Sequence, residues 1–343
     1  MVSEREKQLK NYNKAIFIIF ILSVFFGMWA VISKRNETRK LVEKLADLQY
    51  TFEGEYLSGH APHTVVINYD ISQLIGYDTI LVDFDDKYLA QKRFEVLDKT
   101  KKKITHSYLF ADYYRIKLIA NKKVLKTLGV HVLTKGWQTR ISHKNLLTGT
   151  FEYFDLSPNL DTAQHRLYVS PQQVQELGIP KTDAFFVEHH NIRNFDADLD
   201  NLMFETRIKN AKPEGGINCY DAIIFLIGEN NHVRIQFLQE GCTQWVTLQI
   251  SDVQISGSYN NLSMFGKDLS DWHTVKIETD KKQLHVYFDE IPIFTQRYIE
   301  LLGELKGILY VFKGCGSVDN IKVINRETQE EVYFQDFKQT SAF

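Results

Sequence analysis

Residues 15–33 form an uninterrupted apolar run, nineteen positions without a charged side chain. A helix rises about 1.5 Å per residue, so this run reaches about 30 Å, the depth of a bilayer's hydrocarbon core. A cleavable signal peptide carries a shorter apolar stretch and a small-residue cleavage site, whereas Lys34 and Arg35 follow directly here. A core helix is apolar on one stripe, not all round. The run therefore predicts an uncleaved single-pass membrane anchor.

The segments beside this run predict a tail and a stalk. Residues 1–14 are the expected cytoplasmic tail. Residues 34–50 are the expected helical stalk, in which Leu41, Leu45 and Leu48 share one stripe. Because the stripe covers only about two heptads, it does not establish a coiled coil. A plain stalk is the preferred interpretation, and a homodimer seam along the stalk is the alternative.

The charge balance excludes nucleic acid as an expected partner. The chain has 41 Lys and Arg against 43 Asp and Glu, a formal net charge of −2, and shows no sustained basic face. The short basic run at 99–103 is interpreted as a solvated loop between strands. Aromatic residues make up 13% of the chain, which favours packed β structure over disorder.

From residue 52 the apolar pattern has a period of two. Short strands with a turn about every ten residues predict a β-sandwich over 51–135; the expected strands include 64–69, 78–84, 113–120 and 124–132. Three stretches resemble the PKD domain, an immunoglobulin-like sandwich of cell-surface proteins: Val82-Asp83-Phe84-Asp85-Asp86, His106-Ser107-Tyr108 and Asp112 to Leu118. The chain departs from that pattern at Val82, at Asp85 and at Ala111-Asp112. We expect the aspartates of this region to organise turns.

Residues 136–144 are the expected linker, and 145–343 the expected second all-β domain. Its long antiparallel strands require facing sheets. Its motifs resemble the concanavalin A-like lectin/glucanase superfamily, a jelly-roll sandwich; they are Phe204 to Ile208, Asp271 to Ile277 with Leu284 to Asp289, and Gly316 to Val323. The fold class predicted for the chain is thus all-β, with two sandwiches on an anchor and stalk.

Laminarinase-like enzymes of that superfamily place two carboxylates on one strand, in a Glu-x-Asp-x-x-Glu pattern, where one attacks the sugar and another protonates the leaving oxygen. Here Glu278-Thr279-Asp280 begins such a pattern, but Gln283 stands at its last position. The chain has no Gly-x-Ser-x-Gly, P-loop, His-Glu-x-x-His or Cys-x-x-Cys motif. We therefore predict no catalytic residues, and a glycan hydrolase or lyase with an unrecognised site is the alternative.

Alternating carboxylates at Asp196, Asp198 and Asp200 resemble a calcium loop, and calcium is the only cofactor candidate. An EF-hand would need Gly and Glu where Asn201 and Arg207 stand, so a polar turn is the alternative interpretation. The neighbouring His189 and His190 would point to opposite faces of a strand, which disfavours a shared metal.

The cysteine spacing predicts a disulfide. A two-residue turn at Asn230-Asn231 would pair residues whose numbers sum to 461, and Cys219 and Cys242 have that sum. Opposed positions in an antiparallel pair lie within disulfide range, and such a bond fits an oxidising compartment. Two buried thiols are the alternative. Cys315 is left over.

Sugars stack on exposed aromatic rings, and the candidates for ligand binding are Trp245, Tyr259, Trp272 and Tyr287; a structural role in the core is the alternative for each. The basic residues that flank the anchor do not decide its orientation, because four precede it and five follow within fifteen positions. The two resemblances instead imply a cytoplasmic N-terminus and a periplasmic or extracellular bulk, as in bacterial envelope proteins. We therefore expect a non-catalytic binding or scaffolding protein, with a glycan or an envelope protein as ligand. A structural subunit of an envelope complex is a further alternative.

Overall fold

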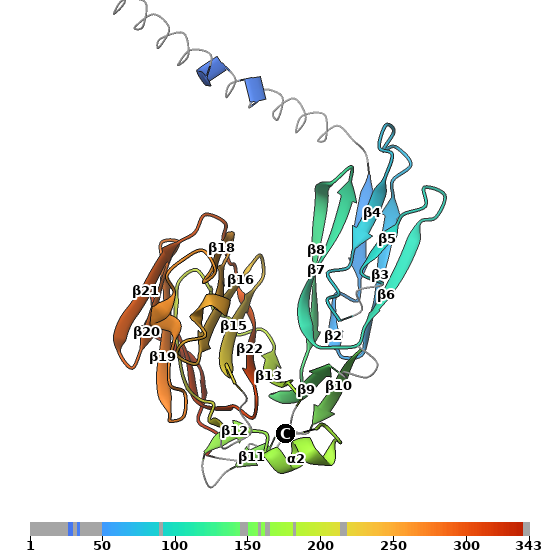
Figure 1. Ribbon diagram of the computed structural model, residues 1–343. Helices are drawn as coiled ribbons and strands as arrows, with labels where there is room; N and C mark the ends of the chain where they lie inside the picture. Colours follow the sequence, from blue (N-terminus) through green and yellow to red (C-terminus); the bar gives the residue numbers. More distant parts are fainter. Residues whose placement is uncertain are drawn as a thin grey trace, which may run out of the picture.

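The computed structural model describes residues 27–29, 33–34, 50–88, 92–144, 150–156, 159–161, 165–180, 183–212 and 218–338 (Figure 1). The predicted tail lies outside these residues, as do nearly all of the predicted anchor at 15–33 and of the predicted stalk at 34–50. Among the helices that the structure describes, none combines the length and the apolar character needed to cross a bilayer.

The first domain is a β-sandwich, as expected for 51–135. In its described residues one sheet has the order β1-β3-β6 and the other the order β2-β8-β7-β4-β5. The strands of the first sheet are β1 (Thr51–Glu55), β3 (His63–Asp70) and β6 (Lys103–Tyr108). Those of the second are β2 (Ser58–His60), β8 (Lys123–Leu133), β7 (Asp112–Ala120), β4 (Ile80–Asp83) and β5 (Phe94–Val96). Alternate residues such as Val65 and Ile67 on β3 and Ile116 and Leu118 on β7 point inward and form the core.

The residues of the PKD-like motifs build one end of this core. The Phe84 ring stacks on His106 with centroids 4.1 Å apart, and Tyr108 donates a 2.7 Å hydrogen bond to the Phe84 carbonyl. Asp83 accepts hydrogen bonds from the Asp85 backbone and from Arg93, both at 2.9 Å. The Asp83 carboxylate organises the turn after β4, as expected for the aspartates of this region.

The second domain is a larger β-sandwich of antiparallel strands. In its described residues one sheet has the order β10-β9-β13-β22-β15-β16-β17-β18, and the other β11-β12-β23-β14-β19-β20-β21 with β24 beside β23. The first of these sheets contains β10 (Phe151–Leu156), β9 (Gln138–Lys144), β13 (Phe185–Ile192), β22 (Leu305–Lys313), β15 (Asp221–Gly228), β16 (His232–Leu238), β17 (Thr247–Ile250) and β18 (Val253–Ser256).

The facing sheet contains β11 (Asn159–Asp161), β12 (Arg166–Tyr168), β23 (Ser317–Asn325), β14 (Leu202–Lys209), β19 (His273–Asp280), β20 (Gln283–Phe288), β21 (Ile291–Arg297) and β24 (Glu331–Gln335). The short helices α2 (Pro171–Glu176), η3 (Thr243–Trp245) and η4 (Ser263–Phe265) lie in the connections. Inward residues of both sheets, including Phe204, Ile277, Ile224 and Tyr310, form one continuous apolar core.

The segment 136–144 differs from its expected role as a linker. It contains β9, which pairs with β10 on one side and with β13 on the other. Polar residues such as Arg140 and Ser142 alternate with Ile141 along β9, and all three are buried. Both faces of the strand are covered, because Ile141 packs in a small apolar cluster with Val187 and Cys315 and Arg140 lies against the Phe110 ring of the first domain. That burial cannot be inferred from the polar residues of β9 alone. Residues 134–137 therefore form the short connection between the domains.

The two sandwiches are in contact through side chains of β7 and β8 on the first and of β13, β15 and β22 on the second. From β7, the Arg115 guanidinium donates hydrogen bonds to the carbonyls of Glu229, at 2.9 Å, and of Gly228 and Asn231 in the β15–β16 turn. His131 Nε2 lies 3.0 Å from the Lys306 carbonyl oxygen. An apolar cluster joins the domains beside these contacts and consists of Ala111, Tyr113, Ile192, Ile227 and Leu309.

Replacing Arg115 by methionine is expected to loosen this junction, because the carbonyls of the 228–231 turn lose a charged donor worth about 1.5–3 kcal/mol. The radius of gyration from small-angle scattering should rise, and amide exchange in the turn should accelerate. Arg326→Met, on the second sandwich, is the control. A scattering curve and exchange rates identical to those of the unmodified chain would contradict the assigned role of Arg115.

Candidate functional site

Trp245 and Tyr259 are the predicted ligand residues that the structure leaves most open to solvent. The side chain of Trp245 is 58% exposed and that of Tyr259 is 90% exposed. Trp245 ends η3, and Tyr259 lies in the loop that follows β18. We call these two rings, with the segments 243–246 and 256–260 that carry them, the aromatic platform.

The two segments of the platform are bonded to each other. Gly257 N donates to the Val246 carbonyl at 2.8 Å, and the Ser258 hydroxyl donates to the Gln244 carbonyl at 3.1 Å. A Cβ atom at position 257 would overlap the Thr243 carbonyl oxygen, so a glycine permits this close approach. The exposed rings therefore stand on a backbone that is held in place by packing and hydrogen bonds.

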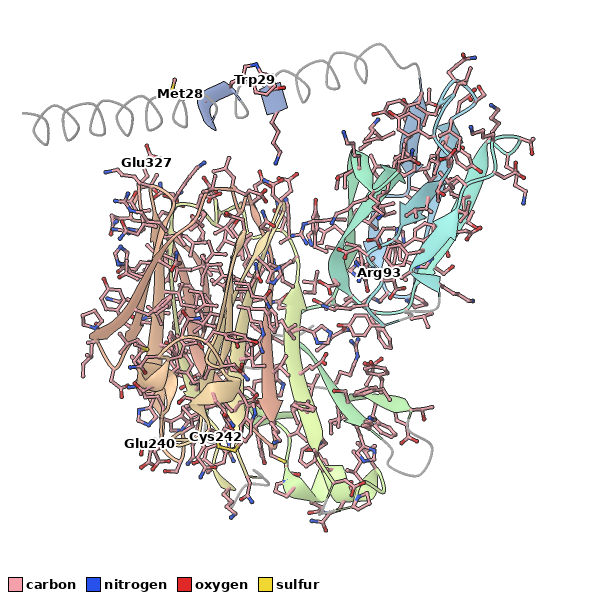
Figure 2. The ribbon with its side chains drawn as sticks, turned by 45° about the horizontal axis from the view of Figure 1, so that its top comes forward. Met28, Trp29, Arg93, Glu240, Cys242 and Glu327 are labelled. Carbon is pink, nitrogen blue, oxygen red and sulfur yellow. A yellow bond between two sulfur atoms is a disulfide. The ribbon has the colours of Figure 1, made fainter. Side chains whose placement is uncertain are left out.

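A disulfide anchors the same region. Cys219 and Cys242 are joined with an S–S distance of 2.02 Å and a Cα–Cα distance of 5.8 Å. Cys242 is the residue immediately before η3, and its carbonyl accepts a hydrogen bond from Trp245 N at 3.1 Å. The bond lies near Glu240, at the end of the sandwich opposite Glu327 (Figure 2). Cys315 is a buried free thiol.

The register behind the disulfide differs from the predicted one. Ile227 pairs with His232 and Asp221 with Leu238, so paired numbers sum to 459 and the turn is centred on Glu229-Asn230. Cys219 and Cys242 lie beyond the last pair of this ladder. Cys219 also adopts a positive φ of 52°. The cysteines meet because the chain leaves the strands there, and not because they are directly opposed within the ladder.

Trp272 and Tyr287 belong to the other sheet and not to the platform. Trp272 precedes β19 and is half-buried, with the Arg207 guanidinium 5.2 Å from its ring centroid. Lys276 Nζ lies 4.4 Å from the ring centroid of Tyr287, whose hydroxyl donates to Glu278 at 3.4 Å. Both rings are engaged by side chains of their own sheet.

The three predicted calcium ligands, Asp196, Asp198 and Asp200, accept hydrogen bonds that hold loops in place. Asp200 accepts hydrogen bonds from the Tyr298 hydroxyl at 2.8 Å and from the backbone of Leu302 and Gly303, both at 2.9 Å. Asp198 accepts from the Asp200 backbone at 3.0 Å, and Asp196 from the Asn194 amide at 2.6 Å. Within the described residues no group of His, Cys, Asp or Glu is arranged to hold a metal ion. These hydrogen bonds are those of the polar-turn interpretation.

The partial carboxylate pattern lies on a hairpin. Glu278 is on β19, where Lys276 and Arg326 approach it at 3.6 and 3.8 Å, and Asp280 pairs with Gln283 at the end of the β19–β20 ladder. The connecting residues Lys281 and Lys282 have positive φ values typical of a tight turn.

His189 and His190 point to opposite sides of β13. His189 lies inside the sandwich, where Thr139 Oγ1 is 2.8 Å from its Nδ1. His190 lies on the outer face of the sheet, between its cross-strand neighbours Gln138 and Leu309. Burial lowers the pKa of each imidazole to about 3. Both side chains are therefore neutral at physiological pH.

A cluster of charged side chains at the domain junction, in which Arg140 and Asp112 are buried, was not apparent in the sequence. Arg140 on β9 donates to Asp155 at 3.0 Å and lies 3.8 Å from Glu188 on β13, with its guanidinium 3.9 Å from the Phe110 ring centroid. Lys87 approaches Asp112 at 2.6 Å. Burial raises the pKa of Glu188, although Arg140 and Lys87 oppose this. The cluster draws on five separate stretches of chain, so no local motif signals it.

Comparisons with known proteins give distant structural likenesses. No family model matches the chain, and no curated protein matches it. Among solved structures, the carbohydrate-binding module CBM66 from Bacillus subtilis has 10% identity and a TM-score of 0.31, covering 56% of this chain and 96% of that one. The metal-free Emp46p carbohydrate recognition domain has 10% identity and a TM-score of 0.31, covering 46% and 82%.

A β-glucanase from Bacillus licheniformis is similar at 10% identity and a TM-score of 0.27, covering 41% of this chain and 77% of that one. These scores are too low for any of the three to indicate a site or a function. The assignment of the second domain as a sandwich rests on its strand order.

Removing the disulfide with Cys219→Ser and Cys242→Ser is expected to lower the free energy of unfolding by about 3 kcal/mol, because the unfolded chain regains the freedom of a loop of more than twenty residues. Urea unfolding measures the change. Thiol titration of the unfolded wild-type chain should detect one thiol without reductant and three with it. Three thiols in the unreduced chain would show that the bond is absent.

Because His189 is neutral in the folded chain, we expect the free energy of unfolding to depend on pH. The unfolded chain takes up a proton below the ordinary pKa of 6.5, whereas the folded chain resists it down to about 3. Stabilisation from this group is therefore present above pH 6.5 and is lost as the pH falls toward 3. From about pH 7.5 to about pH 5 the loss is about 2 kcal/mol.

Urea unfolding of His189→Asn, which cannot titrate and can still bond Thr139, should show a correspondingly shallower pH dependence. His60→Asn, at an exposed histidine, is the control. Equal slopes in His189→Asn and in the unmodified chain would contradict the assignment.

Proposed function

We propose that this chain is a non-catalytic, membrane-anchored binding protein of the bacterial envelope that holds a glycan on the aromatic platform. The observation that carries the proposal is the exposure of Trp245 and Tyr259 on two segments that are bonded together and tied to a disulfide. Large exposed aromatic rings on a held backbone are typical of recognition surfaces.

The chemistry of the platform suits a sugar. A pyranose ring has apolar C–H faces that stack on an indole or phenol ring, and its hydroxyls need hydrogen-bond partners at the edge of the ring. Exposed polar side chains lie on the same two segments, namely those of Gln244, Ser258 and Asn260. Because the disulfide and the inter-segment hydrogen bonds fix the backbone before the ligand arrives, less conformational entropy is lost on binding.

The proposed location is outside the cytoplasm. The disulfide fits an oxidising compartment such as the periplasm or the cell exterior. The apolar run at 15–33 is proposed as the single-pass anchor with a cytoplasmic N-terminus, and the first sandwich as a PKD-like spacer between the membrane and the platform. Envelope proteins, or a second copy paired through the stalk, are the further proposed partners.

Isothermal titration of the full-length chain against a panel of soluble polysaccharides tests the proposal. We expect saturable binding to at least one glycan, weakened about tenfold by Trp245→Ala or Tyr259→Ala because each change removes one stacking surface. Tyr56→Ala is the matched control, since Tyr56 is a 67% exposed tyrosine on the first sandwich.

Two results would refute the proposal that the aromatic platform binds a glycan. One is the absence of binding across the panel. The other is binding that survives both platform substitutions unchanged.

A further inference from the structure

Positive charge gathers at the end of the first sandwich where the chain enters β1. Three segments meet there, at the top of the first sandwich in Figure 1: residues 70–79 after β3, residues 97–103 between β5 and β6, and the β7–β8 turn at 120–124. We call them the basic tip. They contain six lysines against three aspartates, whereas the whole chain has a formal net charge of −2. All six lysines are exposed, namely Lys99, Lys101, Lys102, Lys103, Lys122 and Lys123.

Hydrogen bonds hold the three segments together. Asn121 N donates to the Thr79 carbonyl at 3.1 Å, which joins the β7–β8 turn to the loop after β3. Lys99 Nζ donates to the Leu74 carbonyl at 3.1 Å, which joins the lysine-rich segment to the same loop. The basic tip is therefore one surface on a held backbone.

Most of the positive charge of the basic tip has no partner of opposite charge there. Lys102 lies 2.8 Å from Asp70, and this is the one ion pair that a lysine of the tip forms with a described residue. Asp98 accepts hydrogen bonds from the backbone and the hydroxyl of Thr100, at 2.8 and 2.7 Å. The remaining lysines leave an excess of positive charge that an anionic partner can neutralise.

Apolar side chains project from the same tip. Ile75 is 79% exposed, while Ile71 and Leu74 of its loop are buried in the core of the first sandwich and fix the path of the loop. Val124, in the β7–β8 segment, is 53% exposed. Exposed apolar side chains among lysines are typical of surfaces that contact anionic lipids, because the apolar groups enter the headgroup region while the cations approach the phosphates.

The position of the tip in the chain indicates which anionic surface lies near it. Tyr50 precedes β1 directly, and residues 34–49 separate it from the apolar run at 15–33, the proposed anchor. A segment of that length spans at most about 55 Å when fully extended, so the tip stays within that distance of the bilayer that holds the run. Its effective concentration at the bilayer surface is therefore high, and a weak contact suffices.

The second sandwich leaves the basic tip uncovered. The cavity between the two domains is lined by Pro62, which precedes β3, and by Leu109, which follows β6. These residues lie at the ends of β3 and β6 that are opposite to the tip. The length of β3, eight residues at about 3.3 Å each, places this cavity about 25 Å from the tip.

We propose that the basic tip rests on the surface of an anionic phospholipid bilayer. Ile75 lies at the level of the headgroups, and the lysines of the tip lie against lipid phosphates. The inference rests on the proposed membrane anchor and adds an orientation to it, since the first sandwich then stands on the bilayer with its other end, and the junction with the second sandwich, directed away from the lipid.

Fluorescence quenching in the full-length chain, reconstituted in vesicles, tests this contact. A dye is attached to Ile75→Cys; Cys315 is buried and the other two cysteines form the disulfide, so the label is selective. The vesicles consist of phosphatidylcholine alone or of phosphatidylcholine and phosphatidylglycerol in equal parts, and both contain a lipid with a nitroxide on its headgroup. We expect quenching to be at least about twofold stronger in the anionic vesicles. Ile291→Cys, at a 64% exposed isoleucine of the second sandwich, is the control and should be quenched equally in both.

Charge reversal in a hairpin turn gives a second test. Lys122 and Lys281 are both exposed and both have a positive φ in a turn between paired strands. Lys122→Glu in the labelled chain should lower the ratio of docked to undocked tip about tenfold, because it makes the charge of the tip more negative by two. Lys281→Glu, on the second sandwich, is the matched control and should leave the quenching unchanged.

The proposal is overturned if the dye at position 75 is quenched equally in the two kinds of vesicle, or if Lys122→Glu and Lys281→Glu have the same effect. Shielding of the dye from aqueous iodide without quenching by the nitroxide lipid would assign the tip to a protein partner and would also overturn the lipid contact.

Alkaline carbonate extraction of the same vesicles tests the anchor separately. Release of the chain would refute the anchor and this contact with it. A chain that stays in the vesicles but shows no quenching at position 75 would refute the contact alone. Failure of the polysaccharide panel would refute the aromatic platform and leave the basic tip unaffected.

Discussion

Arg115 and Arg140 bring positive charge into the junction between the two sandwiches, where each must find oxygen partners because an unpaired buried cation is costly. Arg115 donates hydrogen bonds to the carbonyls of the 228–231 turn, and Arg140 forms ion pairs with Asp155 and Glu188. The Arg115 contacts cross between the domains and require one relative placement of them, whereas Arg140 reaches the first domain through the Phe110 ring. The apolar cluster around Leu309 fills the space beside them. A cavity at this junction is lined by Pro62 and Leu109 of the first domain and by Gln138 of the second.

The aromatic platform depends on a different constraint, the covalent bond between Cys219 and Cys242. The bond ties the end of the β15–β16 hairpin to the residue before η3, and so limits the positions that Trp245 can take. The Gly257 and Ser258 contacts then bring the loop of Tyr259 against it. When the backbone beneath exposed rings is already fixed, less conformational entropy is lost as a ligand immobilises those rings.

Several parts of this arrangement could be predicted from the residues, since the information is local. The period of two over residues 64–69 and 113–120 indicates strands, and the aspartates near Phe84 indicate turns. The cysteine pairing was predicted from a register in which the numbers of paired residues sum to 461, whereas in the structure they sum to 459. The two sums differ because the hairpin turn is centred one residue earlier than predicted. β9 was not predicted as a strand from the sequence. Its polar residues Arg140 and Ser142 are buried, although polar residues usually occupy the solvent-facing side of a strand.

By itself, the sequence determined an all-β chain of two sandwiches, a hairpin whose ends could be joined by a disulfide, and a set of four candidate aromatic residues. Alternation along a strand and turn chemistry depend on neighbours in the chain, and they can be read without coordinates. Only the tertiary structure decided that Trp245 and Tyr259 share a platform while Trp272 and Tyr287 do not. It also decided that Arg140 and His190 lie buried at a junction with the first domain. Those outcomes depend on which distant segments cover a given strand face, and that is set by packing between the sheets and between the domains.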